Sequence, residues 1–274
     1  MNFLKKLNKG IKRQLIGLFG NPYKRVGLSW IKVKKLKHLS AGKLRQTSFL
    51  QSKISFYDPF EFLEGVKEIF IHEIYKQEFK PAALIIDCGA NIGLSILYLK
   101  GMFPDAHVIA FEPDSKNYQL LEANMKMQKM QGVELRKEAV WIENTYLTFE
   151  EEGSMSSKIN MDGNTFTGSK KVKAIRLREI LSQSVDFLKL DIEGAEYEVI
   201  KDIRDELNLV KNLFIEYHGT FQQQSQLEEI FQIISSAGFH YYIKEAANVY
   251  PTPLFKHNTQ GSYDIQLNIF CFRE

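Results

Sequence analysis

From Leu84 to Leu99 the sequence is LIIDCGANIGLSILYL. It begins with a short apolar run, Leu84–Ile86, which predicts a buried strand. A turn that contains Gly89 and Gly93 follows, and the apolar residues from Leu94 onward predict a helix. Glycine permits a tight turn and the close approach of a ligand to the backbone. The stretch therefore predicts a strand, a turn open to a ligand and a helix.

Apolar runs and amphipathic segments continue to alternate along the rest of the chain. The further predicted strands are His107–Phe111, Val133–Leu135, Val185–Leu190, Leu213–Ile215, His240–Ile243 and Ile265–Phe272, and the further predicted helices are Pro59–Tyr75, Lys116–Lys126, Ala195–Ile203 and Ser225–Ser236. The polar segment from Tyr146 to Gly168 predicts a hairpin with loops, and Val172–Leu177 is expected to be extended. This alternation is typical of an α/β fold with a mostly parallel sheet and helices on both faces. In such sheets, ligands bind at the carboxyl ends of the strands.

Side chains suited to binding or catalysis follow five of these strands. They are Asp87 after the first strand, Glu112 after the second, Glu138 and Ala139 after the third, Asp191 after the fourth, and Glu216 and His218 after the fifth. The two oxygens of Glu112 can accept hydrogen bonds from both hydroxyls of a ribose. Glu112 stands 19 residues after Gly93, a spacing typical of nucleoside-binding units. A cofactor that contains a nucleoside is therefore expected.

The turn after the first strand separates two classes of cofactor. Dinucleotide-binding folds usually carry Gly-x-Gly-x-x-Gly, which brings a pyrophosphate to a helix N-terminus. Here Asp87 precedes the first glycine and Asn91 stands between the two glycines. An acid at Asp87 would repel a pyrophosphate but suits the ammonium group of S-adenosylmethionine. The residues favour that cofactor over a nicotinamide dinucleotide.

The segment from Leu84 to Gly219 resembles the FkbM family of S-adenosylmethionine-dependent methyltransferases. The resemblance lies in the motifs Ile86–Gly93, Phe111–Pro113, Leu188–Glu196 and Ile215–His218. It implies the class I methyltransferase fold, a Rossmann-like sheet of seven strands of which one, expected at Ile265–Phe272, is antiparallel. It also implies methyl transfer, usually to an oxygen of a sugar or of another natural product.

The resemblance further implies roles for individual residues. Asp87, Gly89, Asn91 and Gly93 would line the methionine end of S-adenosylmethionine, Glu112 would hold the ribose, and Glu138 or its neighbour Ala139 would meet the adenine. The chain has Asp191-Ile192-Glu193-Gly194 where many amino-methyltransferases have an Asn/Asp-Pro-Pro-aromatic motif. This difference favours a hydroxyl acceptor on a sugar, a glycan or a related metabolite.

A hydroxyl is a weak nucleophile until a base takes its proton. His218 is the first candidate for this base, because imidazole titrates near neutral pH. Asp191 and Glu216 are alternatives, and they are also expected either to orient His218 or to hold a divalent metal ion as oxygen ligands. Two rival functions remain open at this stage, namely a nicotinamide-dependent sugar oxidoreductase and a non-catalytic binding module of the same fold. The segment Ser154–Lys158 is either a lid or an exposed hairpin tip.

The charge of the chain is divided unevenly. From Met1 to Tyr57 there are fourteen Lys or Arg residues and no Asp or Glu, which leaves 22 basic and 33 acidic residues in the rest, a balance of −11. We therefore predict a basic helical arm over residues 1–57 and a methyltransferase domain over residues 58–274. Phe3, Leu4, Leu7, Ile11 and Leu15 recur at helical spacing among lysines. Such a helix binds either an anionic membrane surface or the acidic body of the protein. Nucleic acid is not expected, because no binding module accompanies the charge.

The overall composition is that of a folded protein. The 274 residues are 44% hydrophobic and 25% charged, which excludes a disordered or collagen-like chain. The two cysteines, Cys88 and Cys271, form no disulfide framework and are expected to be buried in a reducing compartment. No apolar run reaches 18 residues, so no transmembrane helix is expected. The expected location is the cytoplasm, with peripheral attachment to the inner membrane surface through the arm as a further hypothesis.

Overall fold

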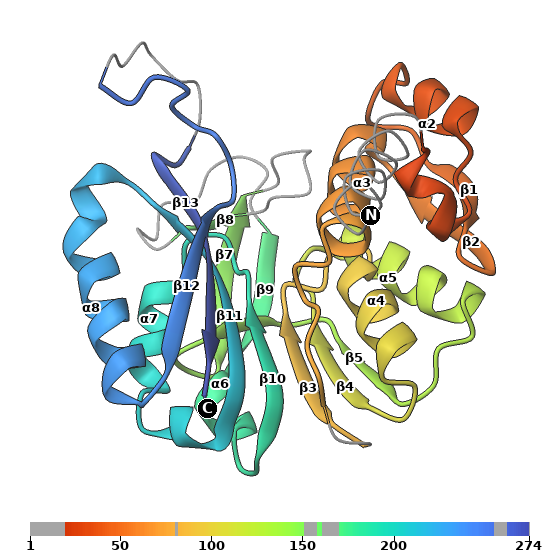
Figure 1. Ribbon diagram of the computed structural model, residues 1–274. Coiled ribbons are helices and arrows are strands. Elements are labelled where there is room, and N and C mark those ends of the chain that lie inside the picture. The colour runs from red at the N-terminus through yellow and green to blue at the C-terminus, as the bar shows by residue number, and fades with distance from the viewer. Residues whose placement is uncertain (1–19, 80–81, 151–157, 161–169, 255–261, 274) are drawn as a thin grey trace, which may run out of the picture. The chain divides into compact units, whose positions relative to one another are not determined.

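The computed structural model describes residues 20–79, 82–150, 158–160, 170–254 and 262–273 (Figure 1). The predicted membrane-binding helix, Phe3 to Leu15, lies outside these residues, as does most of the segment Ser154–Lys158. The chain divides into two compact units, and the division falls between Lys76 and Gln77.

The first unit combines short helices with a β-hairpin. Its elements are η1 (Pro22–Val26), α2 (Trp30–Lys37), β1 (Arg45–Phe49), β2 (Ser52–Phe56), α3 (Pro59–Val66) and the π-helical turn η2 (Lys67–Ile71). Side-chain caps define two of the helix starts, because Ser29 accepts from Lys32 N and Asp58 accepts from Phe60 N and Glu61 N. The chain leaves the helical path at Glu73, whose φ is +52°, so the predicted helix Pro59–Tyr75 is divided and ends early.

An aromatic core holds this unit together. The ring of Phe62 in α3 stacks on Phe56 of β2 at 4.3 Å and meets Phe49 of β1 edge-on at 5.7 Å. All three side chains are fully buried. The hairpin was not predicted, and the predicted division after Tyr57 falls within this unit, because α3 completes the core of the hairpin.

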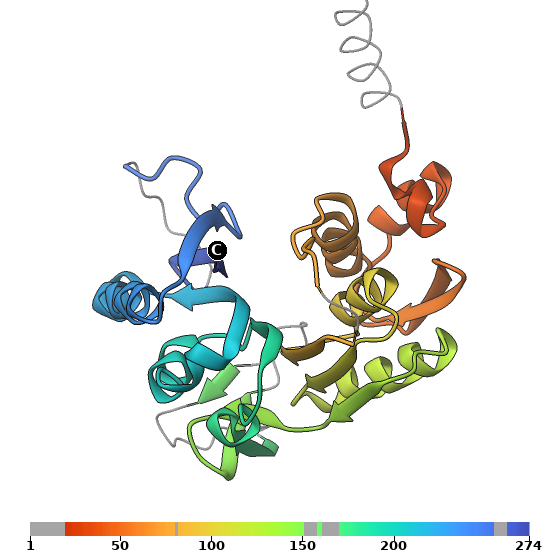
Figure 2. The ribbon, with the colours of Figure 1, turned by 60° about the horizontal axis from the view of Figure 1, so that its bottom comes forward.

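The second unit contains a seven-stranded sheet in the order β12-β13-β11-β10-β3-β4-β5 (Figures 1 and 2). The strands are β3 (Leu84–Cys88), β4 (His107–Phe111), β5 (Val133–Arg136), β10 (Val185–Leu190), β11 (Val210–Gly219), β12 (His240–Glu245) and β13 (Ile265–Phe272). Only β13 runs antiparallel to its neighbours in this sheet. The predicted class I methyltransferase fold, with Ile265–Phe272 as the antiparallel strand, is therefore confirmed.

The helices of this unit follow the strands as the alternation predicts. They are α4 (Leu94–Met102), α5 (Ser115–Met127), α6 (Leu177–Ile180), α7 (Glu196–Asp202), η3 (Glu206–Leu209), η4 (Phe221–Gln223) and α8 (Gln224–Ser236). On one face of the sheet, Leu188 and Leu213 share a hydrophobic core with Val199 of α7 and Ile230 of α8. Among the described residues, no helix is both long and apolar enough to cross a bilayer.

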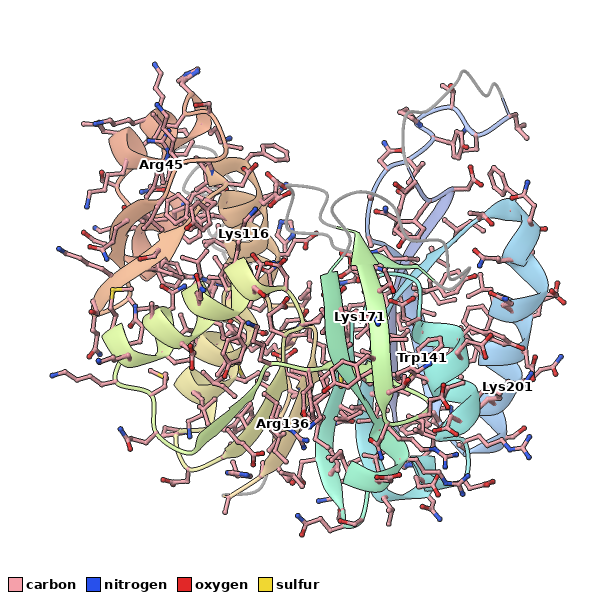
Figure 3. The ribbon with its side chains drawn as sticks, turned by 180° about the vertical axis from the view of Figure 1, so that it is seen from behind. Arg45, Lys116, Arg136, Trp141, Lys171 and Lys201 are labelled. Atoms are coloured by element: carbon pink, nitrogen blue, oxygen red, sulfur yellow. The ribbon has the colours of Figure 1, made fainter. Side chains whose placement is uncertain are left out.

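A smaller sheet of four strands packs into the same core. Its order is β6-β9-β7-β8, with β6 at Ala139–Trp141, β9 at Lys170–Arg176, β7 at Thr145–Glu150 and β8 at Lys158–Asn160. Strand β6, which carries the buried Trp141 (Figure 3), was not predicted because it has only three residues. Both cysteines are buried and unpaired, as expected.

Candidate active site

The turn after β3 is packed tightly against the chain that follows β10. Gly89 has φ +91°, and a Cβ atom at this position would lie 1.9 Å from the carbonyl oxygen of Asp191. The backbone N–H of Asp191 donates to Cys88 O at 3.1 Å, and Gly89 N donates to Phe111 O at 3.0 Å. These contacts require glycine at position 89 and join the ends of β3, β4 and β10.

Glu112 lies at the end of β4 and holds this turn in place. Its Oε2 accepts a hydrogen bond from Asn91 N at 2.8 Å, and its Oε1 accepts one from Asp114 N at 2.9 Å. Burial raises the pKa of Glu112 to about 8, although the two backbone N–H groups oppose this shift. Each carboxylate oxygen has a second lone pair, so Glu112 can still accept two hydroxyl groups.

Asp87 is enclosed within the protein. Its side chain is fully buried, its Oδ2 accepts from the Ser95 hydroxyl at 2.5 Å, and its Oδ1 lies 3.2 Å from Lys189 Nζ. Lys189 also donates to Gly89 O at 2.8 Å and lies 3.1 Å from Asp191 Oδ2. The ammonium group that faces Asp87 is therefore that of Lys189, which also weakens the argument that Asp87 would repel a pyrophosphate.

A cluster of carboxylates surrounds His218 at the end of β11. The imidazole Nδ1 lies 3.3 Å from Glu196 Oε1, and Nε2 lies 3.6 Å from Glu216 Oε1 and 3.9 Å from Glu193 Oε2. Ligand atoms of Asp191, Glu193 and His218 all lie within 4.8 Å of one another. We call Asp191, Glu193, Glu196, Glu216 and His218 the acidic cluster.

Glu196 shapes the loop that brings the acidic cluster together. Its side chain is fully buried and accepts hydrogen bonds from Ile192 N at 3.0 Å and from Gly194 N at 3.0 Å. Between these residues, Glu193 adopts a left-handed conformation with φ +56°, an unusual one for a non-glycine residue. Tyr263 fixes the loop from outside by donating its hydroxyl hydrogen to Glu193 O at 2.6 Å.

The carboxylates keep His218 protonated. Burial lowers the pKa of His218, but the hydrogen bond to Glu196 and the charges of Glu196, Glu193 and Asp191 raise it to about 10. His218 is therefore an imidazolium at neutral pH in this structure. This raised pKa differs from the ordinary value of 6.5 on which the choice of His218 as the base rests, because three negative charges outweigh its burial.

Glu138 forms a separate ion-pair network after β5. Its carboxylate lies 2.7 Å from Arg136 Nε (Figure 3) and 2.6 Å from Lys173 Nζ. Burial raises the pKa of Glu138, but these two cations outweigh burial and lower it. Ala139 is buried as the first residue of β6. Contact of either residue with an adenine stays a prediction.

Comparison with known proteins identifies the family. Residues 87–241, more than half of the chain, match the methyltransferase FkbM domain. The chain belongs to the FkbM family of methyltransferases. The enzyme is thus a methyltransferase of the S-adenosylmethionine type, and the match gives no support to a nicotinamide-dependent oxidoreductase.

Three known methyltransferases are similar in sequence to this FkbM-family enzyme. Methyltransferase sdnD of Sordaria araneosa is 30% identical over 211 residues, which cover 63% of this chain and 80% of the relative. Methyltransferase 1 of Beauveria bassiana (strain ARSEF 2860) is 28% identical over 176 residues, which cover 55% and 71%. The 2-O-methyltransferase NoeI of Sinorhizobium fredii (strain NBRC 101917 / NGR234) is 25% identical over 204 residues, which cover 64% and 83%.

The structure brings some of the predicted site residues of the FkbM-family enzyme together and adds others. Asp191, Glu216 and His218 lie in the acidic cluster, and Gly89 and Asn91 lie beside the ends of β10 and β4. Lys189, Glu193 and Glu196 were not among the predicted site residues. The role of Lys189 could have been predicted from the sequence, because a lysine within the apolar run Phe187–Leu190 indicates a buried ion pair.

The raised pKa of His218 predicts how stability depends on pH. The pKa of His218 is about 10 in the folded state, above the ordinary value of 6.5, so the folded state binds this proton more tightly than the unfolded state does. The resulting stabilisation is complete below about pH 6.5 and is lost as the pH rises through 10. We expect the free energy of unfolding to fall by up to about 1.4 kcal/mol per pH unit across this window. Urea unfolding of the wild type and of His218→Gln between pH 6.5 and 10 measures the difference. Parallel curves for the two proteins would show that His218 does not carry this raised pKa.

Proposed function

We propose that this FkbM-family enzyme transfers the methyl group of S-adenosylmethionine to a hydroxyl group of a sugar, a glycan or a related metabolite. The observation that supports this most directly is the acidic cluster, which gathers proton-accepting groups at the ends of β10 and β11. Oxygen acceptors need such groups, because a neutral hydroxyl attacks a sulfonium methyl group slowly. One relative at 25% identity is named as a 2-O-methyltransferase, which is consistent with an oxygen acceptor.

The residues around the turn after β3 suit the nucleoside and methionine parts of the cofactor. Glu112 offers the second lone pair of each carboxylate oxygen to the two ribose hydroxyls. The space beside Gly89 is filled by Asp191 O and the space beside Gly93 by the side chains of Leu121 and Met125, so these glycines fix the path of the turn, and Asn91 is held by Glu112. Asp191, which is partly exposed, can accept the ammonium group of a methionine moiety, while the buried Lys189 is paired with Asp87, Asp191 and Gly89 O. Asp87 becomes a positioning residue that acts through Lys189.

S-adenosylmethionine supplies a methyl group that is already activated, so the main tasks of the protein are alignment and proton removal. The imidazolium form of His218 cannot accept a proton, and it must first lose its own. Because Nδ1 faces Glu196, the proton has to leave from Nε2, the nitrogen that faces Glu193 and Glu216. Once neutral, His218 can take the proton of an acceptor hydroxyl at Nε2. Glu196 orients the ring throughout.

The same geometry supports a second form of this chemistry, in which a divalent metal ion is held in the acidic cluster. Asp191, Glu193 and His218 offer two carboxylate oxygens and an imidazole nitrogen, a donor set that suits Mn²⁺ or Zn²⁺ as well as Mg²⁺. Glu196 beside Nδ1 is the outer partner that usually orients a metal-binding histidine. A bound ion would lower the pKa of a coordinated hydroxyl. Glu193 is thus a candidate metal ligand together with Asp191. Glu216, which was expected to be a ligand, is not among the three residues whose ligand atoms lie within 4.8 Å of one another.

The proposed reaction is tested by incubating the protein with S-adenosylmethionine that carries an isotope-labelled methyl group. Candidate sugars, glycans and their amino analogues are analysed by mass spectrometry for the gain of one labelled methyl group. We expect the label on oxygen. A label on nitrogen or carbon alone would refute the assignment to hydroxyl groups while leaving methyl transfer intact. Activity that is lost with chelator and restored by one divalent ion would favour the metal-assisted form.

Replacing Glu112 with alanine should weaken the binding of S-adenosylmethionine at least tenfold. At a pH above 8, where Glu112 is ionised, two charge-assisted hydrogen bonds to the ribose would be lost, and such bonds contribute roughly 1.5–3 kcal/mol each. Titration calorimetry measures the affinity. Glu134→Ala is the matched control, because Glu134 is an exposed acid in the neighbouring strand β5. If Glu112→Ala folds and binds the cofactor as tightly as Glu134→Ala does, the ribose is held elsewhere.

A further inference from the structure

The described part of the first unit begins with a segment that carries only positive charge. From Gly20 to Tyr57 the chain has no Asp or Glu, and its basic residues are Lys24, Arg25, Lys32, Lys34, Lys35, Lys37, Lys43, Arg45 (Figure 3) and Lys53. The acids of the unit begin at Asp58, in and after α3. In the described part of this unit, residues 20–76, nine of the eleven Lys and Arg residues therefore precede Asp58.

Helix α2 has a buried side and an exposed side. Val33 and Leu36 are buried, with exposed fractions of 2% and 8%. At 100° per residue, Ile31 points almost directly away from these two, and it is 81% exposed. Trp30, at the start of the helix, is 60% exposed. Two large apolar side chains therefore stand on the solvent side of a helix that already has a buried face.

Three exposed lysines lie on the same helix as these apolar side chains. Lys34, Lys35 and Lys37 are exposed, and the structure gives them no ion pair or hydrogen bond with any residue that it describes. Lys34 lies one turn after both Trp30 and Ile31, and Lys35 lies one turn after Ile31. We call Trp30, Ile31, Lys34, Lys35 and Lys37 the α2 face.

The helix that presents the α2 face is firmly attached to its unit. Ser29 caps its first turn, and Lys32 Nζ donates to Ser48 Oγ of β1 at 2.9 Å. The face is therefore preformed, and binding through it needs no new helix. This feature reduces the ordering cost that an unstructured basic segment would incur.

We infer that the α2 face docks the protein on an anionic lipid bilayer. Lysines around a tryptophan and an aliphatic side chain are the combination that interfacial helices use, because the cations meet lipid phosphates while the apolar groups enter the boundary of the acyl chains. Tryptophan favours this boundary, since its ring is apolar and its N–H is polar. A nucleic acid would use the lysines, but it offers nothing to an aliphatic side chain at the centre of the face. The inference does not depend on the proposed methyl transfer.

The first test measures binding of the full-length protein to vesicles. Vesicles of phosphatidylcholine with phosphatidylserine are compared with vesicles of phosphatidylcholine alone, by co-sedimentation and by tryptophan emission. The chain has two tryptophans, and Trp141 is buried within the second unit. We expect a blue shift of the emission with anionic vesicles, and we expect Trp30→Phe to abolish the shift. Binding without any change in Trp30 emission would overturn the inference.

The second test separates charge from apolar contact. Changing Lys34, Lys35 and Lys37 together to glutamine should weaken binding to anionic vesicles about 10²-fold at low salt. The matched control changes Lys116, Lys126 and Lys129, three exposed lysines of the second unit, to glutamine and should leave binding nearly unchanged. Ile31→Asn should weaken binding about tenfold, and this loss should persist when salt is added.

Three results would contradict docking through the α2 face. One is equal loss of binding in the triple variant and in its control, which would show a general effect of net charge. Another is unchanged vesicle binding in both the triple variant and Ile31→Asn, which would place the membrane contact elsewhere in the chain. The third is tight binding to single-stranded or duplex nucleic acid without binding to anionic vesicles, which would assign the lysines to phosphodiesters. Each result is independent of whether the enzyme methylates a hydroxyl.

Discussion

The His218→Ala variant is expected to transfer methyl groups about 10²–10⁴-fold more slowly than the wild type, the range that a general base usually contributes. His218 is the group around which Glu193, Glu196 and Glu216 are arranged, so its loss removes the proton acceptor and one of the three candidate metal ligands. The affinity for S-adenosylmethionine should stay within about twofold if the ring serves only the acceptor. Single-turnover rates and calorimetry measure the two quantities.

His107→Ala is the matched control for this variant, because His107 is exposed at the opposite end of β4 from Glu112. The dependence of the rate on pH then separates the two forms of the chemistry. If His218 must lose its proton unaided, the rate should rise with pH toward a pKa near 10. If a divalent ion displaces that proton, the rate should be high near neutral pH and should depend on the ion. A His218→Ala enzyme as fast as His107→Ala would remove His218 from both mechanisms.

Gly89→Ala is expected to lower the free energy of unfolding by about 2–5 kcal/mol. The left-handed conformation at φ +91° costs a residue with a Cβ roughly 1–2 kcal/mol. The contact with Asp191 O, at 1.9 Å in the native backbone, adds an overpacking cost of about 1–3 kcal/mol because the chain after β10 must move away. Urea or thermal unfolding measures the loss, and binding of S-adenosylmethionine should weaken in parallel.

Alanine substitutions at two other glycines separate the conformational cost from the overpacking cost. Gly42 also has positive φ, +85°, but a Cβ there would meet no atom within 4 Å, so Gly42→Ala should show only the conformational cost. Gly101 lies in α4 with open space around it, and Gly101→Ala should be neutral or stabilising by up to about 1 kcal/mol. If Gly89→Ala costs no more than Gly42→Ala does, the close approach of β3 and β10 is not a constraint on the fold.

Much of the second unit was predictable because its signals are local. Apolar runs such as His107–Phe111 and Val185–Leu190 are buried strands, and each is followed by the polar group that the sequence analysis singled out. In a parallel sheet these groups come to one edge, so Glu112, Asp191 and His218 could be assigned to a site without coordinates. The hairpin Arg45–Phe56 gave a weaker signal, because its strands are short and partly exposed.

The sequence by itself determined the alternation of the main strands and helices from Leu84 onward and the group of strand-end acids, and its resemblance to a family implied the antiparallel last strand. Tertiary structure decided which of those acids face one another and in what charge state. Glu196 and His218 are 22 residues apart in the chain, and a left-handed residue at Glu193 helps to bring the loop onto the imidazole. Lys189, 100 residues after Gly89, neutralises Asp87 inside the core. A pKa depends on burial and on charges that act through space, so the protonation of His218 and the enclosure of Asp87 follow from the folded arrangement and not from the spacing of residues along the chain.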